Sequence, residues 1–258
     1  MKLPDEYAQV DFDDVSAFGV QTILPWLRGT LAAGITLAQW AAAQAHAERR
    51  QGRGRVDVVP APVAGPDGRE RWAVRHYWRG GAVAAPLLRD RYLAVGEPRP
   101  VHELEASHQA RLRGIPTPAV VAGAVYRAGI FYRADLVTEL VPDGADLGEI
   151  LFGATPPEPA RARASLEAAG HLVRRLEEAR IHHSDLNAKN ILLAGDEGAD
   201  AYLLDLDGCR ILDARAIIPA GPMRRRLERS LRKLEDRSGR PLGSDAWSAL
   251  KTGFGEEA

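Results

Sequence analysis

The sequence predicts an α+β fold of two lobes, a small β-rich lobe followed by a mainly helical one. Short apolar runs flanked by Gly and Pro, which are typical of strands, lie in the first half of the chain at residues 51–59, 71–77 and 131–141. Residues 160–180 have a strongly helical composition. With 258 residues and 45% hydrophobic content, the chain can bury the core of one bilobal domain, with lobes expected at residues 1–140 and 141–258.

The elements between these strands are expected to be helices and turns. The first lobe should start irregularly and continue as one Ala-rich helix that ends near residues 47–48. A second helix at residues 100–113 should end before a Gly-Ile-Pro stretch. In the second lobe, apolar runs at residues 191–193 and 201–204 are separated by a Gly- and Asp-rich stretch, so they predict a hairpin.

Composition limits the classes of function. A formal net charge of −1 gives no general attraction to nucleic acid. The single cysteine, Cys209, excludes an internal disulfide framework and fits a reducing cytosol. The apolar stretch at residues 31–45 is shorter than the roughly 20 residues that cross a bilayer, and the N-terminus lacks the features of a secretory signal. We therefore expect the chain in the cytosol, or on a membrane surface that faces it.

The most informative segment is residues 183–193, His-Ser-Asp-Leu-Asn-Ala-Lys-Asn-Ile-Leu-Leu. It follows the catalytic-loop pattern of protein kinases, H-R-D-L-x-x-x-N. In that pattern, Asp185 accepts the proton of the acceptor hydroxyl and Asn190 binds Mg²⁺. Asp205, at the end of the second run of the expected hairpin, is placed to hold Mg²⁺ against the nucleotide phosphates. The ordered set predicts an ATP-dependent phosphotransferase.

Each of these residues also has a plain structural interpretation. Asp185 and Asn190 could cap or turn the chain, and Asp205 could simply end a strand. The order and the spacing together favour the catalytic interpretation, because turn chemistry requires neither. Ser184 replaces the arginine with which a protein kinase reads a phosphorylated activation loop, so that mode of switching is not expected. His183 is expected to brace the loop rather than to handle protons.

The first lobe supplies candidates for holding the nucleotide phosphates. Gly52 and Gly54 precede an apolar strand, and glycines let backbone N–H groups approach phosphates closely. By itself the Gly-x-Gly would indicate a plain hairpin, and its position ahead of a strand that ends in a cation favours the phosphate-covering interpretation. Arg75 stands where a kinase carries its phosphate-anchoring Lys. On the following helix, Glu103 is the best candidate to pair with Arg75, and Glu105 is the alternative. A solvated helical carboxylate is the plain interpretation of either.

The strand at residues 131–141 leads into a Pro-Asp-Gly turn. In kinases this is the hinge, where backbone groups bind the adenine edge. Glu139 and Val141 are the residues whose backbone would do so here, and a plain strand and turn is the alternative. After Asp207 the chain reaches Arg224 with no long activation segment and no A-P-E element, which favours a small or lipid-borne acceptor over a peptide.

Two arginine-bearing segments are more specific than the generic kinase loop. They are residues 75–81, Arg-His-Tyr-Trp-Arg-Gly-Gly, and residues 225–231, Arg-Arg-Leu-Glu-Arg-Ser-Leu. With these segments and the catalytic loop, the chain resembles the bacterial lipopolysaccharide core kinases from about residue 51 to 234, and most of all the 3-deoxy-D-manno-octulosonic acid (Kdo) kinases. Arg75 in place of Lys and Asp207 in place of Gly also fit that pattern.

The resemblance implies a protein-kinase-like bilobal fold and an ATP-dependent transfer of phosphate to the 4-hydroxyl of Kdo. It implies ATP and Mg²⁺ as cofactors and a Kdo-containing lipid A precursor as acceptor. It also implies a peripheral position on the anionic surface of the inner membrane, at its cytoplasmic face. Two other functions stay open, namely another small-molecule or protein kinase of the same fold, and a nucleotide-binding pseudokinase with a scaffolding role.

The basic run at residues 224–233 has two interpretations. It is either a solvated helix face with i,i+4 partners such as Glu228 and Arg232, or a surface for an anionic glycolipid or anionic headgroups, at about 1 kcal/mol per cation. The same question applies to Arg79, Arg89 and Arg91. Lys189 is either an exposed residue or a cation close to the transferred phosphoryl group.

Overall fold

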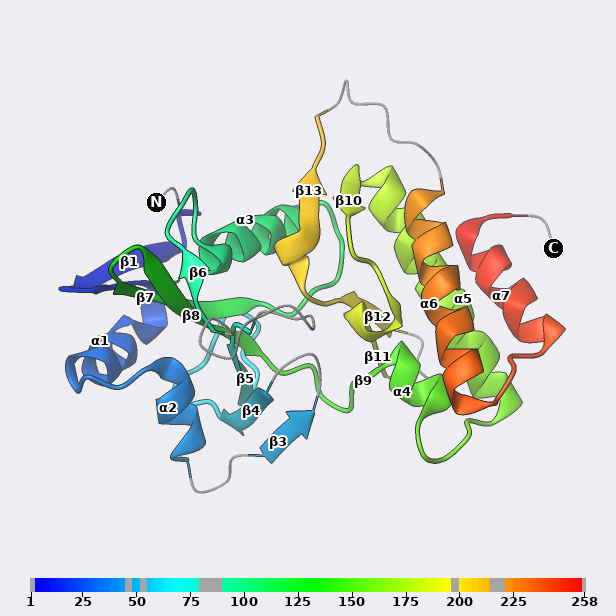
Figure 1. Cartoon of the computed structure of the whole chain (residues 1–258), viewed down its shortest axis with the longest axis horizontal. Coiled ribbons are helices and arrows are strands. Elements are labelled where there is room, and N and C mark those ends of the chain that lie inside the picture. Colours follow the sequence, from blue (N-terminus) through cyan, green and yellow to red (C-terminus); the bar gives the residue numbers. More distant parts are fainter. Residues whose placement is uncertain are drawn as a thin grey trace. The chain divides into compact units, whose positions relative to one another are not determined.

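The structure is a computed structural model that describes residues 3–44, 48–51, 55–78, 90–195, 200–213 and 221–256, with only the backbone of residues 49–51 and 55. The chain forms two compact units (Figure 1). The first comprises Met1–Glu105 and Pro118–Leu140, and the second comprises Ala106–Thr117 and Val141–Ala258. The first unit is rich in strands and the second in helices, as the sequence predicts.

An antiparallel sheet of eight strands organises the first unit. The strand order is β1-β2-β7-β8-β5-β4-β3, and β6 pairs with β8 beside this path. The strands are β1 (Tyr7–Phe12), β2 (Val15–Val20), β3 (Glu48–Gln51), β4 (Arg55–Pro60), β5 (Arg71–His76), β6 (Tyr92–Leu93), β7 (Val120–Ala128) and β8 (Phe131–Glu139). The central pair β5 and β8 is thereby hydrogen-bonded on both sides.

The expected single Ala-rich helix is wrong. The segment contains two shorter helices, α1 (Leu24–Ala32) and α2 (Leu37–Ala42), and residues 45–47 lie outside the described residues. Gly34, with a φ of 74°, takes the left-handed conformation between them. Thr36 then starts α2 with a capping box, in which its hydroxyl accepts from the Gln39 N–H and the Gln39 side chain accepts from the Thr36 N–H.

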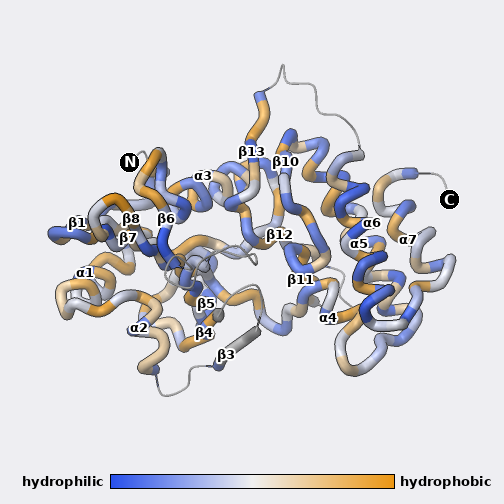
Figure 2. Tube along the Cα trace, viewed as in Figure 1, coloured by the Kyte–Doolittle hydropathy of each residue, from blue (hydrophilic) through white to orange (hydrophobic). Residues whose placement is uncertain are grey.

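The N-terminal residues also form a hairpin, β1 and β2, where an irregular start was expected. This hairpin extends the sheet next to β7. Together with α1 and α2, whose residues are predominantly hydrophobic (Figure 2), it contributes Val20, Leu27 and Leu37 to a core shared with β4, β5, β7 and β8. Trp26 packs edge-on against both Trp40 and Trp72, with ring centroids 4.8 and 4.9 Å apart. Residues 3–44 therefore contribute both strands and core side chains to the first unit.

Helix α3 (Arg99–Leu112) begins in the first unit and ends in the second. The described residues of the second unit form four further α-helices: α4 (Leu147–Phe152), α5 (Pro159–Glu178), α6 (Pro222–Ser238) and α7 (Ser244–Phe254). A Cβ on Gly170 would lie 2.5 Å from the Leu250 carbonyl oxygen, and one on Gly253 would lie 2.3 Å from the Glu167 carbonyl oxygen. Glycines thus allow α5 and α7 to approach each other at backbone distance.

Short strands complete the second unit. β9 (Ala145–Asp146), β11 (Ile191–Ala194) and β12 (Asp200–Leu203) form one sheet, and β10 (Ile181–His183) pairs with β13 (Cys209–Ile211). The predicted hairpin is confirmed, because β11 and β12 pair antiparallel with Ile191 opposite Leu203. Among the described residues, no helix is long and apolar enough to cross a membrane.

Candidate active site

The backbone of the second unit brings the three residues of the predicted catalytic set into neighbouring segments. His183 pairs with Cys209 across β10 and β13, and the Ser184 N–H donates to the Gly208 carbonyl oxygen at 2.9 Å. The Leu204 N–H donates to the Asn190 carbonyl oxygen at 2.8 Å. The loop that carries Asp185 and Asn190 is therefore tied on both sides to the segment that carries Asp205.

Asn190 is 3% exposed and holds the loop from within. Its Nδ2 donates to the Asp185 carbonyl oxygen at 3.1 Å. Asn187 donates to the same oxygen at 2.8 Å and accepts from the Lys189 N–H. Because the Asn190 amide nitrogen is used in this way, its Oδ1 is the atom left for a cation. The Asp185 side chain is exposed, as a base that meets an incoming hydroxyl needs to be.

His183 supports the same loop. Its side chain is buried, and its Nδ1 accepts from the Asp185 N–H at 3.2 Å. Burial lowers the pKa of His183, and the nearby Asp205 and Asp185 carboxylates oppose that shift. A neutral ring that accepts at Nδ1 carries its proton on Nε2. These contacts support the expectation that His183 braces the loop.

Asp205 adopts the left-handed conformation, with φ 59° and ψ 61°, immediately before a 3-10 turn at Leu206–Gly208. For a residue with a Cβ this conformation costs of order 1–3 kcal/mol and is concentrated at functional sites. The half-buried Asp207 lies in the turn that follows. The strained backbone of Asp205 therefore favours a functional role of its carboxylate over a stabilising one.

The donor atoms of this set suit Mg²⁺. The ion prefers oxygen ligands and is often held by one or two carboxylates together with phosphate oxygens. Asn190 and Asp205 offer an amide and a carboxylate oxygen in adjoining segments. In the described part of the chain, no group of three or more His, Cys, Asp and Glu residues is arranged so that it could hold a metal ion by itself. The residues therefore fit an ion shared with a nucleotide better than a protein-only cage.

In the first unit, the predicted pairing of Arg75 with Glu103 is confirmed. Nη2 of Arg75 lies 2.5 Å from Oε2 of Glu103, whose side chain is 6% exposed. Glu105, the alternative partner, is exposed, and Arg75 pairs with Glu103 instead. Burial makes such a pair costly to break, because either charge alone would be left desolvated. The pair fixes the Arg75 guanidinium on β5.

Tyr77 belongs to the same cluster and was not predicted. Its hydroxyl donates to Oε2 of Glu103 at 2.5 Å, and the Arg75 guanidinium carbon lies 4.7 Å from the centre of its ring. A residue two positions beyond Arg75 points to the same face of an extended chain. This spacing is the one sequence feature that could have placed Tyr77 beside Arg75. Tyr77 thus contacts both members of the ion pair.

Glu139 ends β8, and its buried side chain has a structural role. Its two carboxylate oxygens accept from the Asp67 N–H at 2.8 Å and from the Arg69 N–H at 3.0 Å, which holds the turn between β4 and β5. Its backbone N–H donates to the Ala119 carbonyl oxygen. The buried Val141 lies two residues further on, where the chain passes from the first unit to the second segment of the second unit. Their adenine-binding role stays a prediction, and Gly52 and Gly54 lie outside the described residues.

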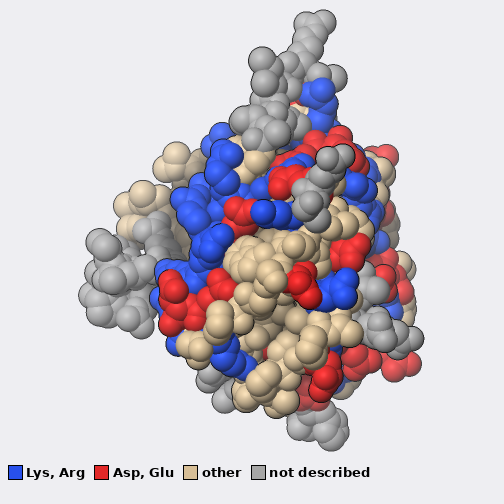
Figure 3. Space-filling model, turned by 90° about the vertical axis from the view of Figure 1, so that its right-hand side faces the viewer, with Lys and Arg blue, Asp and Glu red and all other residues tan. Residues whose placement is uncertain are grey.

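The basic run lies on α6 and divides into two groups. Arg224 pairs with Glu177 at 2.6 Å and Glu256 at 2.8 Å, which raises its pKa, and the Arg232 guanidinium lies 4.7 Å from the Trp247 ring. These two arginines have structural partners. Arg225, Arg226, Arg229 and Lys233 are exposed, as Arg232 also is, and the Arg229 Nε donates to the Arg225 carbonyl oxygen of the same helix. Figure 3 shows basic side chains gathered along one side of this end of the molecule. Arg79 and Arg89 lie outside the described residues.

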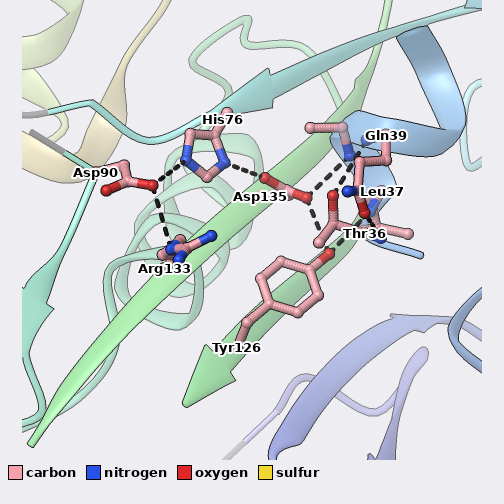
Figure 4. A network of polar contacts seen from close by, with 9 residues as sticks. Thr36, Leu37, Gln39, His76, Asp90, Tyr126, Arg133 and Asp135 are labelled. Carbon is pink, nitrogen blue, oxygen red and sulfur yellow. Dashed lines mark hydrogen bonds and ion pairs between the residues drawn. The ribbon is translucent and has the colours of Figure 1, made fainter. Parts of the chain in front are cut away.

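A second polar cluster of the first unit surrounds Asp135, which is fully buried (Figure 4). Its Oδ1 lies 2.6 Å from Nδ1 of His76, and its Oδ2 accepts from the Tyr126 hydroxyl and from the Ala38 N–H, each at 2.9 Å. Burial, followed by the Asp135 charge, raises the pKa of Tyr126. The Leu37 N–H donates to the Tyr126 hydroxyl. The cluster fastens the start of α2 to β5, β7 and β8.

The chain matches a known protein family and several of its members. The profile described as "Lipopolysaccharide kinase (Kdo/WaaP) family" matches residues 38–250. A 3-deoxy-D-manno-octulosonic acid kinase of Xanthomonas oryzae pv. oryzae (strain PXO99A) is 36% identical over 203 residues, which are 75% of this chain and 73% of that protein. The one of Photobacterium profundum is 30% identical over 184 residues, 70% of this chain and 74% of that protein.

The match is shorter for another relative. The kinase of the same name from Haemophilus influenzae (strain PittEE) is 35% identical over 142 residues, so the chain spans only 56% of its length. Among solved structures, one titled "WaaP in complex with acyl carrier protein" superposes with a TM-score of 0.51 at 19% identity, covering 90% of this chain and 86% of that one. This likeness confirms the expected kinase-like α+β fold.

Proposed function

Because the chain belongs to the lipopolysaccharide kinase (Kdo/WaaP) family, we propose that it is an ATP-dependent kinase that phosphorylates the 4-hydroxyl of Kdo in the lipopolysaccharide inner core. The observation that carries the proposal is the family match over residues 38–250, which includes every residue of the predicted site. The backbone ties among the segments of Asp185, Asn190 and Asp205 support it independently. The acceptor is a Kdo-containing lipid A precursor.

The mechanism is positional and electrostatic, as phosphoryl transfer generally requires. Asp185 orients the sugar hydroxyl and accepts its proton late in the transfer. Asn190 Oδ1 and the Asp205 carboxylate would hold Mg²⁺, which would supply positive charge to the phosphates of ATP. Arg75, fixed by Glu103 and Tyr77, would steady those phosphates. The sequence prediction that Gly52 and Gly54 cover them concerns residues outside the described part of the chain. Glu139 and Val141 bind the adenine edge through their backbone.

The proposed location is peripheral, at the cytoplasmic face of the inner membrane. The exposed cations Arg225, Arg226, Arg229 and Lys233 on α6 give the second unit a surface for anionic headgroups or for the phosphates of the glycolipid. Arg224 and Arg232 keep α6 in place through their own partners, so the exposed cations rest on a fixed helix.

An acceptor panel tests the proposal. Purified protein with radiolabelled ATP and Mg²⁺ should label a Kdo-containing lipid A precursor and should label neither a peptide mixture nor an aminoglycoside. Asp185→Asn should lower the rate by a factor of about 10² or more while ATP binding survives, since positioned acid–base groups contribute at least that much. Labelling of an aminoglycoside in preference to the Kdo lipid would assign another small-molecule kinase, and binding of ATP without turnover on any acceptor would assign a pseudokinase.

A further inference from the structure

Three of the large hydrophobic side chains that the structure exposes lie together in the first unit. Leu93 is 51% exposed, Val95 is 83% exposed and Ile130 is 70% exposed. They belong to two adjoining segments, residues 93–96 and 128–130, which we call the apolar tip. The remaining residues of the tip are Ala94, Gly96, Ala128 and Gly129, so the tip has no polar side chain. Figure 2 shows hydrophobic residues at both segments.

Hydrogen bonds hold the two segments of the tip together. Leu93 pairs with Phe131 where β6 joins β8, and the Ala94 N–H donates to the Ile130 carbonyl oxygen at 2.9 Å. Behind the tip, the buried Tyr92 stacks on Tyr132 with ring centroids 5.6 Å apart. The side chains of the tip are therefore exposed on an ordered base. Clustered exposed apolar side chains usually mark an interaction surface, whereas single ones need no explanation.

The size and the surroundings of the tip favour a lipid surface over a protein. A stable protein interface involves about 20–30 residues a side and about 800 Å² of surface, far more than three large side chains offer. Arginines flank the tip. Arg91 precedes Tyr92 and Arg127 precedes Ala128 in the sequence, and the Arg99 guanidinium carbon lies 4.5 Å from the centre of the Tyr92 ring. Apolar side chains backed by Tyr and Arg are typical of interfacial anchors.

Acidic residues moderate the charge of this region. Asp90 pairs with Arg133 at 3.2 Å, and Glu97 is exposed directly after the tip in the sequence. Binding through the tip should therefore depend mainly on apolar insertion. This distinguishes the tip from the exposed cations of α6, whose attraction to anionic lipid falls with salt.

We propose that the apolar tip inserts into the interfacial region of a phospholipid bilayer and anchors the first unit to the membrane. The inference rests on the proposed function only for the presence of a membrane near the acceptor. The tip binds lipid without nucleotide or glycolipid. It gives the chain a contact with the bilayer that is separate from its contact with the acceptor.

Vesicle flotation with the full chain tests the inference. Vesicles of phosphatidylethanolamine and phosphatidylglycerol, without ATP or acceptor, should carry the protein at high salt. Replacing Leu93, Val95 and Ile130 together with Ser should lower the bound fraction by about tenfold or more, since each large side chain contributes its own apolar area. Leu112→Ser, at an exposed apolar position on α3 that is 69% exposed, is the matched control and should bind like wild type.

A second readout covers the case in which the triple variant fails to fold. The single native cysteine, Cys209, is buried, so Val95→Cys can be labelled selectively with an environment-sensitive dye. Its emission should increase and shift to the blue when vesicles are added. Equal flotation of wild type and the triple variant, unchanged dye emission, or a dimer of wild type that the triple substitution dissociates would each overturn the inference. Phosphorylation of a detergent-dissolved acceptor, measured separately, reports on the proposed function alone and should survive the triple substitution.

Discussion

At the residue scale, the proposed metal ligands are chemically unequal. Asp205 offers a charged carboxylate in a left-handed backbone conformation, whereas Asn190 offers a neutral amide oxygen and also ties the loop through Nδ2. Asp205→Ala should therefore lose Mg²⁺-dependent ATP binding more severely than Asn190→Ala. Titration calorimetry with ATP, with and without Mg²⁺, measures the difference. Equal affinity of wild type and Asp205→Ala for Mg-ATP would remove Asp205 from this role.

Tyr77 gives a second prediction at this scale. Tyr77→Phe keeps the ring beside Arg75 and removes the hydrogen bond to Glu103, so the guanidinium should lose part of its fixed position. A hydrogen bond to a charged group contributes about 1.5–3 kcal/mol, and we expect the KM for ATP to rise by about tenfold or more with a smaller change in kcat. Tyr132→Phe, on the neighbouring β8, is the control and should leave the KM for ATP unchanged. Equal kinetics of both variants would make Tyr77 a plain core residue.

The residues of the proposed catalytic loop could be selected from the sequence because the pattern that singles them out depends on a local spacing. His183, Asp185 and Asn190 lie within one short loop, and Asp205 follows the next hairpin. Tyr77 could not be assigned with the same rules, because its importance depends on Glu103, a residue 26 positions away on α3. The structural role of the Glu139 carboxylate was missed for the same reason, since its partners Asp67 and Arg69 are set by the fold of a distant turn.

At the element scale, one buried carboxylate, that of Asp135, fastens the start of α2 to the sheet. Asp135→Ala would leave the Tyr126 hydroxyl, the Ala38 N–H and His76 without their shared acceptor. Breaking such a buried network costs about 3–5 kcal/mol, which should appear as a lower unfolding midpoint. Fluorescence of the Trp26, Trp40 and Trp72 cluster should change early in the transition, because α2 carries Trp40.

A matched exposed carboxylate provides the control for this prediction. Asp11→Ala, on the exposed side of β1, should change the stability by less than about 0.5 kcal/mol, as surface substitutions usually do. If Asp135→Ala has the same unfolding midpoint as Asp11→Ala and wild type, the network does not measurably stabilise the position of α2.

The strands that the sequence analysis did not predict, β1, β2 and β7, have weak local sequence patterns. β7 is rich in Ala and Gly, which seldom favour strands, and it becomes a strand because β2 and β8 flank it. The β1–β2 turn uses Asp13 at a φ of 24° rather than an Asn-Gly pair, so it has no strong hairpin signal. The start of α2, by contrast, could have been predicted, because Thr36 and Gln39 have the spacing of a capping box.

At the scale of the whole molecule, an almost neutral chain concentrates exposed cations on α6. If these cations meet an anionic glycolipid, replacing Arg225, Arg226 and Arg229 with Gln should raise the KM for the lipid acceptor by about tenfold or more, at about 1 kcal/mol per cation. The salt dependence of that KM should flatten, because screening acts on the charges that were removed. The KM for ATP should not change, since the residues proposed to hold the nucleotide lie elsewhere in the chain.

A variant of equal net charge separates position from total charge in this experiment. Arg161, Arg163 and Lys251 are exposed on α5 and α7, and replacing them with Gln removes the same three positive charges. This control should keep the acceptor KM and its salt dependence close to those of wild type. If both triple variants raise the acceptor KM equally, the KM depends on the net charge of the protein and not on the position of the arginines. If only the thermal midpoint of the α6 variant falls, those arginines form a structural helix face, and the lipid contact must lie on other basic residues such as Arg91.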